Sequence, residues 1–156
     1  MDFATYQAIT TLQQHYGQIL DSNDLSSWPD LFTTDGQYLL QSRENFDAAL
    51  PLGVMHLTSQ AMLRDRVYAV AHTIYHEPYY QRHVCGAPVV SMDDHGVVHA
   101  ESSYIVIRTQ RDNMPQILST GRYIDRIVQS DGAWLFHSRS AIFDNDLIPN
   151  SIIKPV

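Results

Sequence analysis

The sequence predicts an α+β domain in which helices pack on a strongly bent antiparallel sheet. Two observations support this fold class. Apolar residues recur at helical spacing in the first half of the chain, and the second half consists of long strand-like segments separated by turn residues. Helices that precede a run of strands favour a segregated arrangement. A chain of 156 residues without an internal repeat or linker predicts one domain over residues 1–156.

Three helices are expected in the first half of the chain. The first runs from about Asp2 to Leu20, because apolar residues recur there at helical spacing: Phe3, Tyr6, Ile9, Leu12, Tyr16 and Ile19. A short second helix fits Trp28 to Phe32, with Pro29 in its first turn. The third begins after the capping residue Ser59 and runs to about Ala71.

Strands make up most of the remainder. Asp35 and Gly36 predict a turn that leads into a strand from Gln37 to Arg43, and the segment from Asn45 to Gly53 is expected to be a loop. Beyond Pro78 the expected strands are connected by turns rich in Gly, Asn, Asp and Pro. These strands cover Tyr79–Met92, Val97–Gln110, Ile117–Gln129 and Ala133–Asp144.

From His99 to Asp144 the expected strands carry apolar residues on both faces. In the segment Val98–Arg108, one face holds Val98, Ala100, Tyr104 and Val106, and the other holds Ile105 and Ile107 beside His99 and Glu101. An antiparallel sheet with one face in water shows a clean alternation of apolar and polar residues instead. The helices can cover one face, so we expect the other to meet a partner subunit or to enclose a cavity.

Composition excludes several classes of protein. The net charge is −7 and the arginines are scattered, so a nucleic-acid partner is not expected. No apolar run approaches the roughly 20 residues of a membrane-spanning helix. The single cysteine, Cys85, cannot form an internal disulfide, and no export signal is evident, so we expect a cytoplasmic protein without membrane association.

One group of residues resembles a metal site. His72 and His76 are four residues apart and Glu77 follows, so on a helix the two imidazoles would share a face. Pro78 disfavours a helix at the residue before it, and no further ligand can be identified. We therefore expect surface histidines and no metal. A Rieske cluster needs two cysteines and two histidines, which a chain with one cysteine cannot supply.

Acid–base catalysis is a second possibility. A carboxylate beside a histidine or tyrosine in a dry pocket can transfer protons near neutral pH. The candidates are Asp21, Tyr38, His56, His72, His99 and Asp125, although nothing in their spacing requires them to converge. Charged strand residues are more often paired across a sheet or at an interface. Cys85 has no neighbour that would activate it and is expected to be a small buried thiol.

Arginines on the expected strands suggest an interface. Arginine together with Tyr, Trp and Phe on one sheet face matches the composition of protein interfaces. A solvated sheet face is the alternative, but an exposed apolar face of several strands exceeds what monomers normally tolerate. Arg108 belongs to this strand group, and the residues expected to fix subunit geometry are Arg82, His83, Arg122, Arg126, Trp134 and Arg139.

The order of several short motifs resembles the small (beta) subunit of aromatic-ring-hydroxylating dioxygenases. The match covers nearly the whole chain, and its final hairpin is the stretch from Gly121 to Asp144, GRYIDRIVQSDGAWLFHSRSAIFD. Each motif alone is loose, and their order and spacing make the match specific. The earlier motifs are Asp21, Trp28-Pro29, Phe32, Asp35-Gly36, Tyr38, Met62-Leu63-Arg64-Asp65-Arg66 and Arg82-His83.

The resemblance implies a cone-shaped, strongly curved, mixed sheet of the nuclear transport factor 2-like type, with the helices packed in its concave side. It also implies assembly with a large (alpha) subunit that carries a Rieske 2Fe-2S cluster and a mononuclear non-haem iron, as three large and three small chains. In that family the small subunit is mainly structural. The compact N-terminal region is similar to small subunits of dioxygenases for aromatic carboxylates such as benzoate or terephthalate.

Our leading hypothesis is therefore a non-catalytic beta subunit of a terminal oxygenase, without a cofactor of its own. The same fold also hosts dehydratases, isomerases and cyclases, so fold alone does not decide function. The alternative is a free-standing lyase or isomerase whose cavity uses Asp21, Tyr38, His72 and His99. A third class is a small-molecule binding protein that uses the cone as a ligand cage.

Overall fold

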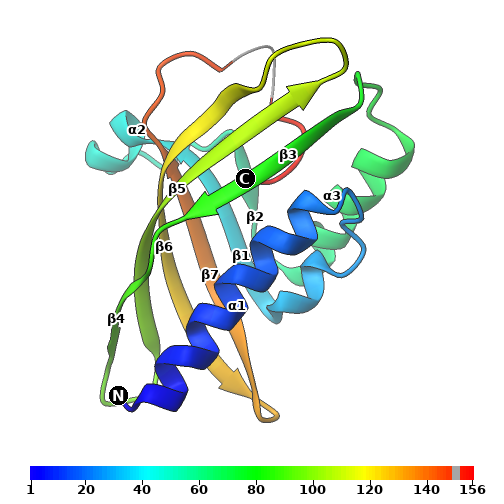
Figure 1. Cartoon of the computed structure of the whole chain (residues 1–156). Helices are drawn as coiled ribbons and strands as arrows, with labels where there is room; N and C mark the ends of the chain where they lie inside the picture. The colour runs from blue at the N-terminus through cyan, green and yellow to red at the C-terminus, as the bar shows by residue number, and fades with distance from the viewer. Residues whose placement is uncertain (149–151) are drawn as a thin grey trace.

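A long helix and a shorter one lie on the concave side of a curved sheet (Figure 1). The structure is a computed structural model, and it describes residues 1–148 and 152–156. The two helices are α1 (Phe3–Asp21) and α3 (Gln60–His72), and a single 3-10 turn, Trp28–Leu31, follows α1. Within the described residues, none of the helices has the length and apolar character needed to cross a bilayer.

The ends of both helices agree with their capping residues. Asp2 precedes α1 and its carboxylate accepts a hydrogen bond of 2.8 Å from the Thr5 N–H. Ser59 precedes α3 and its hydroxyl accepts one of 3.3 Å from the Met62 N–H. The expected positions of both helices are confirmed, as is the short turn that contains Pro29. In α3 only Leu63 is fully buried, so this helix covers the sheet less tightly than α1 does.

The sheet is mixed and curved. Its strands are β1 (Phe32–Ser42), β2 (Met55–Leu57), β3 (Tyr79–Cys85), β4 (Val89–Met92), β5 (Val98–Gln110), β6 (Gln116–Ser130) and β7 (Ala133–Phe143). The order is β2-β1-β7-β6-β5-β3, and β4 pairs with β5. The β1–β7 pair is parallel and the other pairs are antiparallel. The predicted α+β class with a bent, mixed sheet is confirmed.

The structure corrects several element boundaries. The Asp35–Gly36 dipeptide does not form a turn before β1 but lies within it, at an irregularity of the β1–β7 register between Phe32 and Gln37. A Cβ atom at Gly36 would lie 2.8 Å from the Thr33 carbonyl oxygen, so a glycine is required there. A turn-forming dipeptide can equally form a bulge when a neighbouring strand continues the pairing.

Two further expectations were too simple. The expected strand Tyr79–Met92 is divided into β3 and β4 by a break that contains Pro88, which cannot donate a backbone hydrogen bond to a sheet. The expected loop from Asn45 to Gly53 begins inside the short helix α2 (Arg43–Asp47), and the strand β2, which was not expected, follows the loop at Met55. Ser42 caps α2, because its hydroxyl accepts a hydrogen bond of 3.2 Å from the Asn45 N–H.

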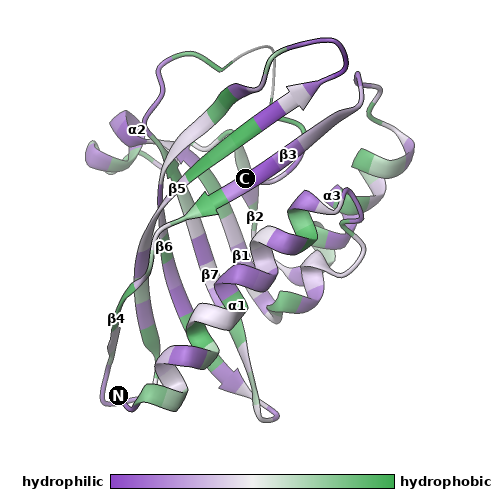
Figure 2. Ribbon diagram, viewed as in Figure 1, coloured by the Kyte–Doolittle hydropathy of each residue, from purple (hydrophilic) through white to green (hydrophobic). Residues whose placement is uncertain are grey.

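Strand β5 alternates more cleanly than the sequence indicated. Val98, Ala100 and Tyr104 point inward and are buried, whereas His99 and Glu101 are exposed on the outer face. The expectation that this strand lacks alternation is therefore wrong for its first half. Figure 2 shows hydrophobic residues in the middle of β5 and at the adjoining end of β3. The outer face is thus polar in one region and apolar in another, where the paired residues Val84 and Ile105 are exposed.

A bulge in β7 determines which of its side chains face the interior. Ile127 of β6 pairs with Phe136, and the next residue back, Arg126, pairs with Ser138, so β7 has one extra residue at this point. Beyond the bulge the alternation is shifted by one position. Phe136 and Arg139, three residues apart, are consequently both buried in the interior, where Arg139 contacts the Phe136 ring.

Candidate functional site

The centre of the cone holds a buried ion pair. The Nε and Nη2 atoms of Arg139 donate hydrogen bonds of 2.8 and 2.7 Å to the two carboxylate oxygens of Asp125. The Gln13 amide of α1 donates a further bond of 2.9 Å to Asp125. The Arg139 side chain is 1% exposed and that of Asp125 is 0% exposed. A pair so deeply buried is held in place by bidentate geometry and by its additional hydrogen bond.

Three aromatic rings surround the guanidinium of Arg139. Its central carbon lies 4.0 Å from the ring centroid of Tyr16, 4.3 Å from that of Tyr123 and 4.1 Å from that of Phe136. Burial tends to lower the pKa of Arg139, but the Asp125 carboxylate raises it overall. Burial also raises the pKa of Tyr16 and Tyr123 well above the ordinary value. These groups keep fixed protonation states at neutral pH, so they are suited to structural support rather than proton transfer.

The segment Ile152–Val156 fills the rest of the interior. The Val156 carbonyl accepts hydrogen bonds from the Tyr16 hydroxyl at 2.7 Å and the Tyr38 hydroxyl at 3.0 Å. The Val156 N–H in turn donates to the Tyr38 oxygen at 3.1 Å. Arg66 of α3 donates to the carbonyls of Ile152 and Ile153 and fixes this segment from the other side. Val156 is 0% exposed, so the space between Tyr16 and Tyr38 is occupied by the chain itself.

An aspartate–histidine pair, which the sequence did not indicate, joins the last residue of α1 to β3. The His83 Nδ1 atom is 2.7 Å from an Asp21 carboxylate oxygen, and the His83 backbone N–H donates to both oxygens of Asp21, at 3.0 and 3.1 Å. Their side chains are 1% and 9% exposed. The two residues are 62 positions apart in the chain, and no local pattern links them.

This pair is oriented like the pairs that serve as general bases, but it is enclosed. The His83 Nε2 atom is buried and has no hydrogen-bonding partner among the described residues. Its ring packs edge-on against Tyr16 with centroids 6.5 Å apart. Asp21 and His83 line neither the cavity beside Lys154 nor the one beside Trp134. A base needs access to the proton that it removes, so the pair has no route to a substrate in this structure.

The four residues of the alternative catalytic site do not converge. Tyr38 is bonded to the Val156 backbone, and burial raises its pKa to about 12. Asp21 is paired with His83. His72 lies on α3, with its ring 4.7 Å from that of Tyr68. His99 lies on the outer face of the sheet, 3.4 Å from Asp93. The proposed combination of these four residues in one cavity is therefore wrong.

The possible metal site also lacks the required geometry. α3 ends at His72, so His76 lies outside the helix and the two imidazoles do not share a helix face. Among residues 1–148 and 152–156, no three His, Cys, Asp or Glu side chains lie close enough to bind one ion. The chain has one cysteine, Cys85, whereas a Rieske cluster needs two. The residues present do not fit either iron group that the resemblance implies.

The residues expected at an interface fall into two groups. Arg82, Arg122 and Arg126 lie on the outer face of the sheet, where Arg82 is 74% exposed and Arg122 contacts Glu101 at 3.2 Å. Arg139 and His83 are inside the cone and their side chains are each 1% exposed, so an interface role for these two is wrong. The β7 bulge and the carboxylate of Asp21 explain their inward positions.

Trp134 belongs to neither of these groups. It is half-buried beside a small cavity between α1 and the start of β7. Its ring packs against the hydrophobic core of the chain.

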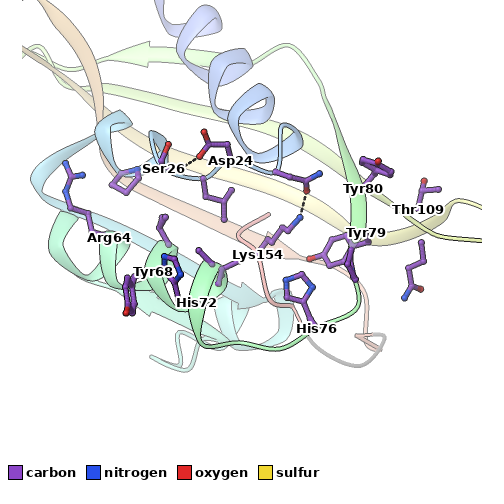
Figure 3. A pocket seen from close by; sticks show the side chains of 18 of the residues that line it. Asp24, Ser26, Arg64, Tyr68, His72, His76, Tyr79, Tyr80, Thr109 and Lys154 are labelled. Carbon is purple, nitrogen blue, oxygen red and sulfur yellow. Dashed lines mark hydrogen bonds between the residues drawn. The ribbon is translucent and has the colours of Figure 1, made fainter.

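A larger cavity adjoins the segment Ile152–Val156. It measures about 1090 Å³ and is enclosed by α3, the residues after α1, the start of β3 and the end of β5. Figure 3 shows Lys154 in this cavity beside Tyr79, with His72 and His76 near it. Apolar residues make up much of its wall: Leu25, Pro29, Val67, Val70, Ala71 and Pro78.

Comparison with known proteins identifies relatives over the full length. A family model described as a SnoaL-like domain matches residues 2–140. The chain is 33% identical over 156 residues to the anthranilate 1,2-dioxygenase small subunit of Burkholderia cepacia, which covers 99% of this chain and 96% of the relative. It is 26% identical over 148 residues to the terephthalate 1,2-dioxygenase terminal oxygenase component subunit beta 2 of Comamonas sp, covering 95% of this chain and 96% of the relative.

A solved structure agrees with these sequence matches. The protein, from Novosphingobium aromaticivorans, is described as the beta subunit of an aromatic-ring-hydroxylating dioxygenase. Its identity to this chain is 34% and its TM-score is 0.87, with 97% of this chain and 95% of that chain covered. The motif order, the curved sheet and these matches give one answer: the chain belongs to the SnoaL-like domain family and, within it, to the small (beta) subunits of aromatic-ring-hydroxylating dioxygenases.

Proposed function

We propose that this chain is a structural subunit of a terminal oxygenase and leaves the chemistry to a large subunit. The observation that carries the proposal is the filled cone. The Asp125–Arg139 pair, its aromatic rings and the segment Ile152–Val156 occupy the centre of the cone. The Asp21–His83 pair, which has the right chemistry for a base, is enclosed.

The large subunit would hold both iron groups. Because one cysteine cannot ligate a Rieske cluster, the redox centre and the mononuclear iron belong to another polypeptide in this proposal. Electrons from a reductase and dioxygen would react there. The relatives are named for anthranilate and terephthalate, both aromatic carboxylates, which supports an aromatic carboxylate as the class of substrate.

The outer sheet face is the proposed contact surface, in an assembly of three large and three small chains. It combines exposed apolar side chains, Val84 and Ile105, with the guanidinium groups of Arg82 and Arg126. Register places Arg126 opposite His99 of β5 and Ser138 of β7, in the middle of this face. Apolar area flanked by arginines is the composition typical of subunit interfaces.

The test uses affinity purification of the tagged full chain from its native host. We expect the wild type to retain a chain with Rieske cysteine and histidine motifs, together with iron. The double variant Arg82→Glu/Arg126→Glu should retain at least about tenfold less, because charged groups buried at an interface are costly to replace. The control is Arg111→Glu, which lies in the turn after β5, where the Arg111 side chain is 92% exposed.

Two results would count against the proposal. If the wild type retains no such iron-containing chain, the subunit role is wrong. If the double variant retains as much as the wild type and the control, the outer face is not the contact surface.

A further inference from the structure

The only lysine of the chain is buried without a counter-ion. Lys154 is 5% exposed. Its ammonium group donates a hydrogen bond to the Asn23 side-chain oxygen and lies 4.5 Å from the Tyr79 ring centroid. Among the described residues no carboxylate lies within ion-pair distance of it, and residues 149–151 are Pro, Asn and Ser, which carry no side-chain carboxylate. Buried charges in proteins are normally paired, so this ammonium lacks an anion.

The ammonium group lines the large cavity. In Figure 3 Lys154 extends between α3 and the start of β3, with Tyr79 beside it and the dashed hydrogen bond leading to the loop after α1. The volume of about 1090 Å³ is slightly above the usual range for pockets that bind small molecules, which is about 300–1,000 Å³. An apolar wall with a few polar groups is also typical of such pockets.

The two arginines of the cavity wall are each paired with a carboxylate, whereas Lys154 is not. Arg64 pairs with Asp30 at 2.7 Å and Arg111 with Asp112 at 3.9 Å. Asp24 is the carboxylate of the cavity wall, and it accepts a hydrogen bond of 3.0 Å from the Ser26 N–H in its own turn. The remaining titratable side chains of the wall are His72, His76, Tyr68, Tyr79 and Tyr80. Asp24 is exposed to solvent, whereas Lys154 is buried, so Lys154 is the buried charge of the wall that has no counter-ion among the described residues.

We propose that this cavity binds a small aromatic carboxylic acid, with its carboxylate on the Lys154 ammonium and its ring between the Tyr79 side chain and the apolar wall of α3. Tyrosine and apolar side chains line the space next to the ammonium, where a flat ring fits. A single unbalanced cation matches a single negative charge.

Burial affects this lysine in a way that can be measured. Removal from water lowers the pKa of Lys154. A bound carboxylate would favour the charged ammonium and raise this pKa again. The neutral groups around the ammonium, the Asn23 amide and the Tyr79 ring, cannot supply that charge. The inference is independent of the subunit role, because it concerns residues of this chain alone.

Because the chain has one lysine, nuclear magnetic resonance can observe it without ambiguity. We would label the full chain with ¹³C-lysine and follow the Lys154 side-chain signal during titration with sodium benzoate. Benzyl alcohol has the ring without the charge, and acetate has the charge without the ring. We expect benzoate to shift the signal saturably and to raise the pKa of Lys154, and acetate to bind at least about tenfold more weakly.

Two variants distinguish the roles of charge and ring. Lys154→Met should weaken benzoate binding, measured by calorimetry, by about tenfold or more, because a charge-assisted contact is lost. Tyr79→Leu should weaken it while Lys154 stays charged. Arg43→Gln, on α2 and away from the cavity, should bind benzoate as the wild type does.

The wild-type titration decides the matter even if a variant fails to fold. Absence of a saturable shift with millimolar benzoate would overturn the proposal. Equal shifts with acetate and benzoate would also overturn it, since the ring would then contribute nothing. A shift of the Lys154 signal on addition of the large subunit, but not of benzoate, would assign the ammonium to a subunit contact and reject the small-molecule site.

Discussion

Replacing Asp125 by alanine tests the role of the buried ion pair most severely. The change leaves the Arg139 guanidinium, 1% exposed, without the carboxylate that accepts its hydrogen bonds of 2.8 and 2.7 Å. Loss of one partner of a buried pair costs about 3–5 kcal/mol, because the remaining charge stays uncompensated in the interior. The total free energy of unfolding of a domain is only about 5–15 kcal/mol, so Asp125→Ala should remove a large part of it.

Urea unfolding followed by circular dichroism measures this loss. With a denaturant slope of about 2 kcal/mol per molar urea, the midpoint should fall by about 2 M. The double variant Asp125→Ala/Arg139→Met removes both charges and should lose less stability than Asp125→Ala alone. The control is Glu101→Ala, which breaks the exposed Arg122–Glu101 pair of 3.2 Å and should cost less than about 1 kcal/mol.

Two results would refute this reasoning. One is a loss below about 1 kcal/mol for Asp125→Ala, since the pair would then behave like an exposed one. The other is a double variant that loses as much stability as Asp125→Ala and Arg139→Met together when each is measured alone. Additive losses would mean that the two residues do not interact.

Two other predictions concern the sheet and the buried tyrosines. A Cβ at Gly121 would lie 1.9 Å from the Ile142 carbonyl oxygen, so Gly121→Ala should lower the free energy of unfolding by at least about 3 kcal/mol. Gly96 has open space around it, so Gly96→Ala should cost only about 1–2 kcal/mol, for its left-handed backbone. Equal costs in urea unfolding would contradict this prediction. Burial raises the pKa of Tyr16, Tyr38 and Tyr123 in the folded chain above the pKa of about 10 that a tyrosine has in the unfolded chain. Their contribution to stability is therefore complete below pH 10 and is lost as the pH rises above it. Urea midpoints should therefore fall above pH 10, with a slope of about 1.4 kcal/mol per pH unit for each tyrosine, and Tyr38→Phe should lower the slope by one such contribution; a flat profile from pH 9 to 11 would contradict the prediction.

The sequence predicted the parts of the fold that depend on local patterns. Helical spacing located α1, Ser59 located the start of α3, and turn residues separated the long strands of the second half. These features depend on neighbours within a few positions, and such neighbours can be read from the chain. The order of short motifs also predicted the family and therefore the curvature of the sheet.

Features that depend on distant contacts could not be predicted in this way. The bulge in β7 turns Arg139 inward, and only its pairing with β6 reveals the extra residue. The Asp21–His83 pair joins residues 62 positions apart. The segment Ile152–Val156 has no periodic pattern, and its place inside the cone results from hydrogen bonds to Tyr16 and Tyr38. An inward arginine and an outward arginine therefore look alike in the sequence.

The native mass of the particle that contains this chain tests the proposed structural role most directly. Purification from the host under gentle conditions, followed by native mass spectrometry, gives the number of chains and the bound iron in one experiment. We predict a particle of three large and three small chains in which all iron leaves with the large chain when the subunits separate. A solitary small chain, or iron that stays with the small chain, would contradict the account.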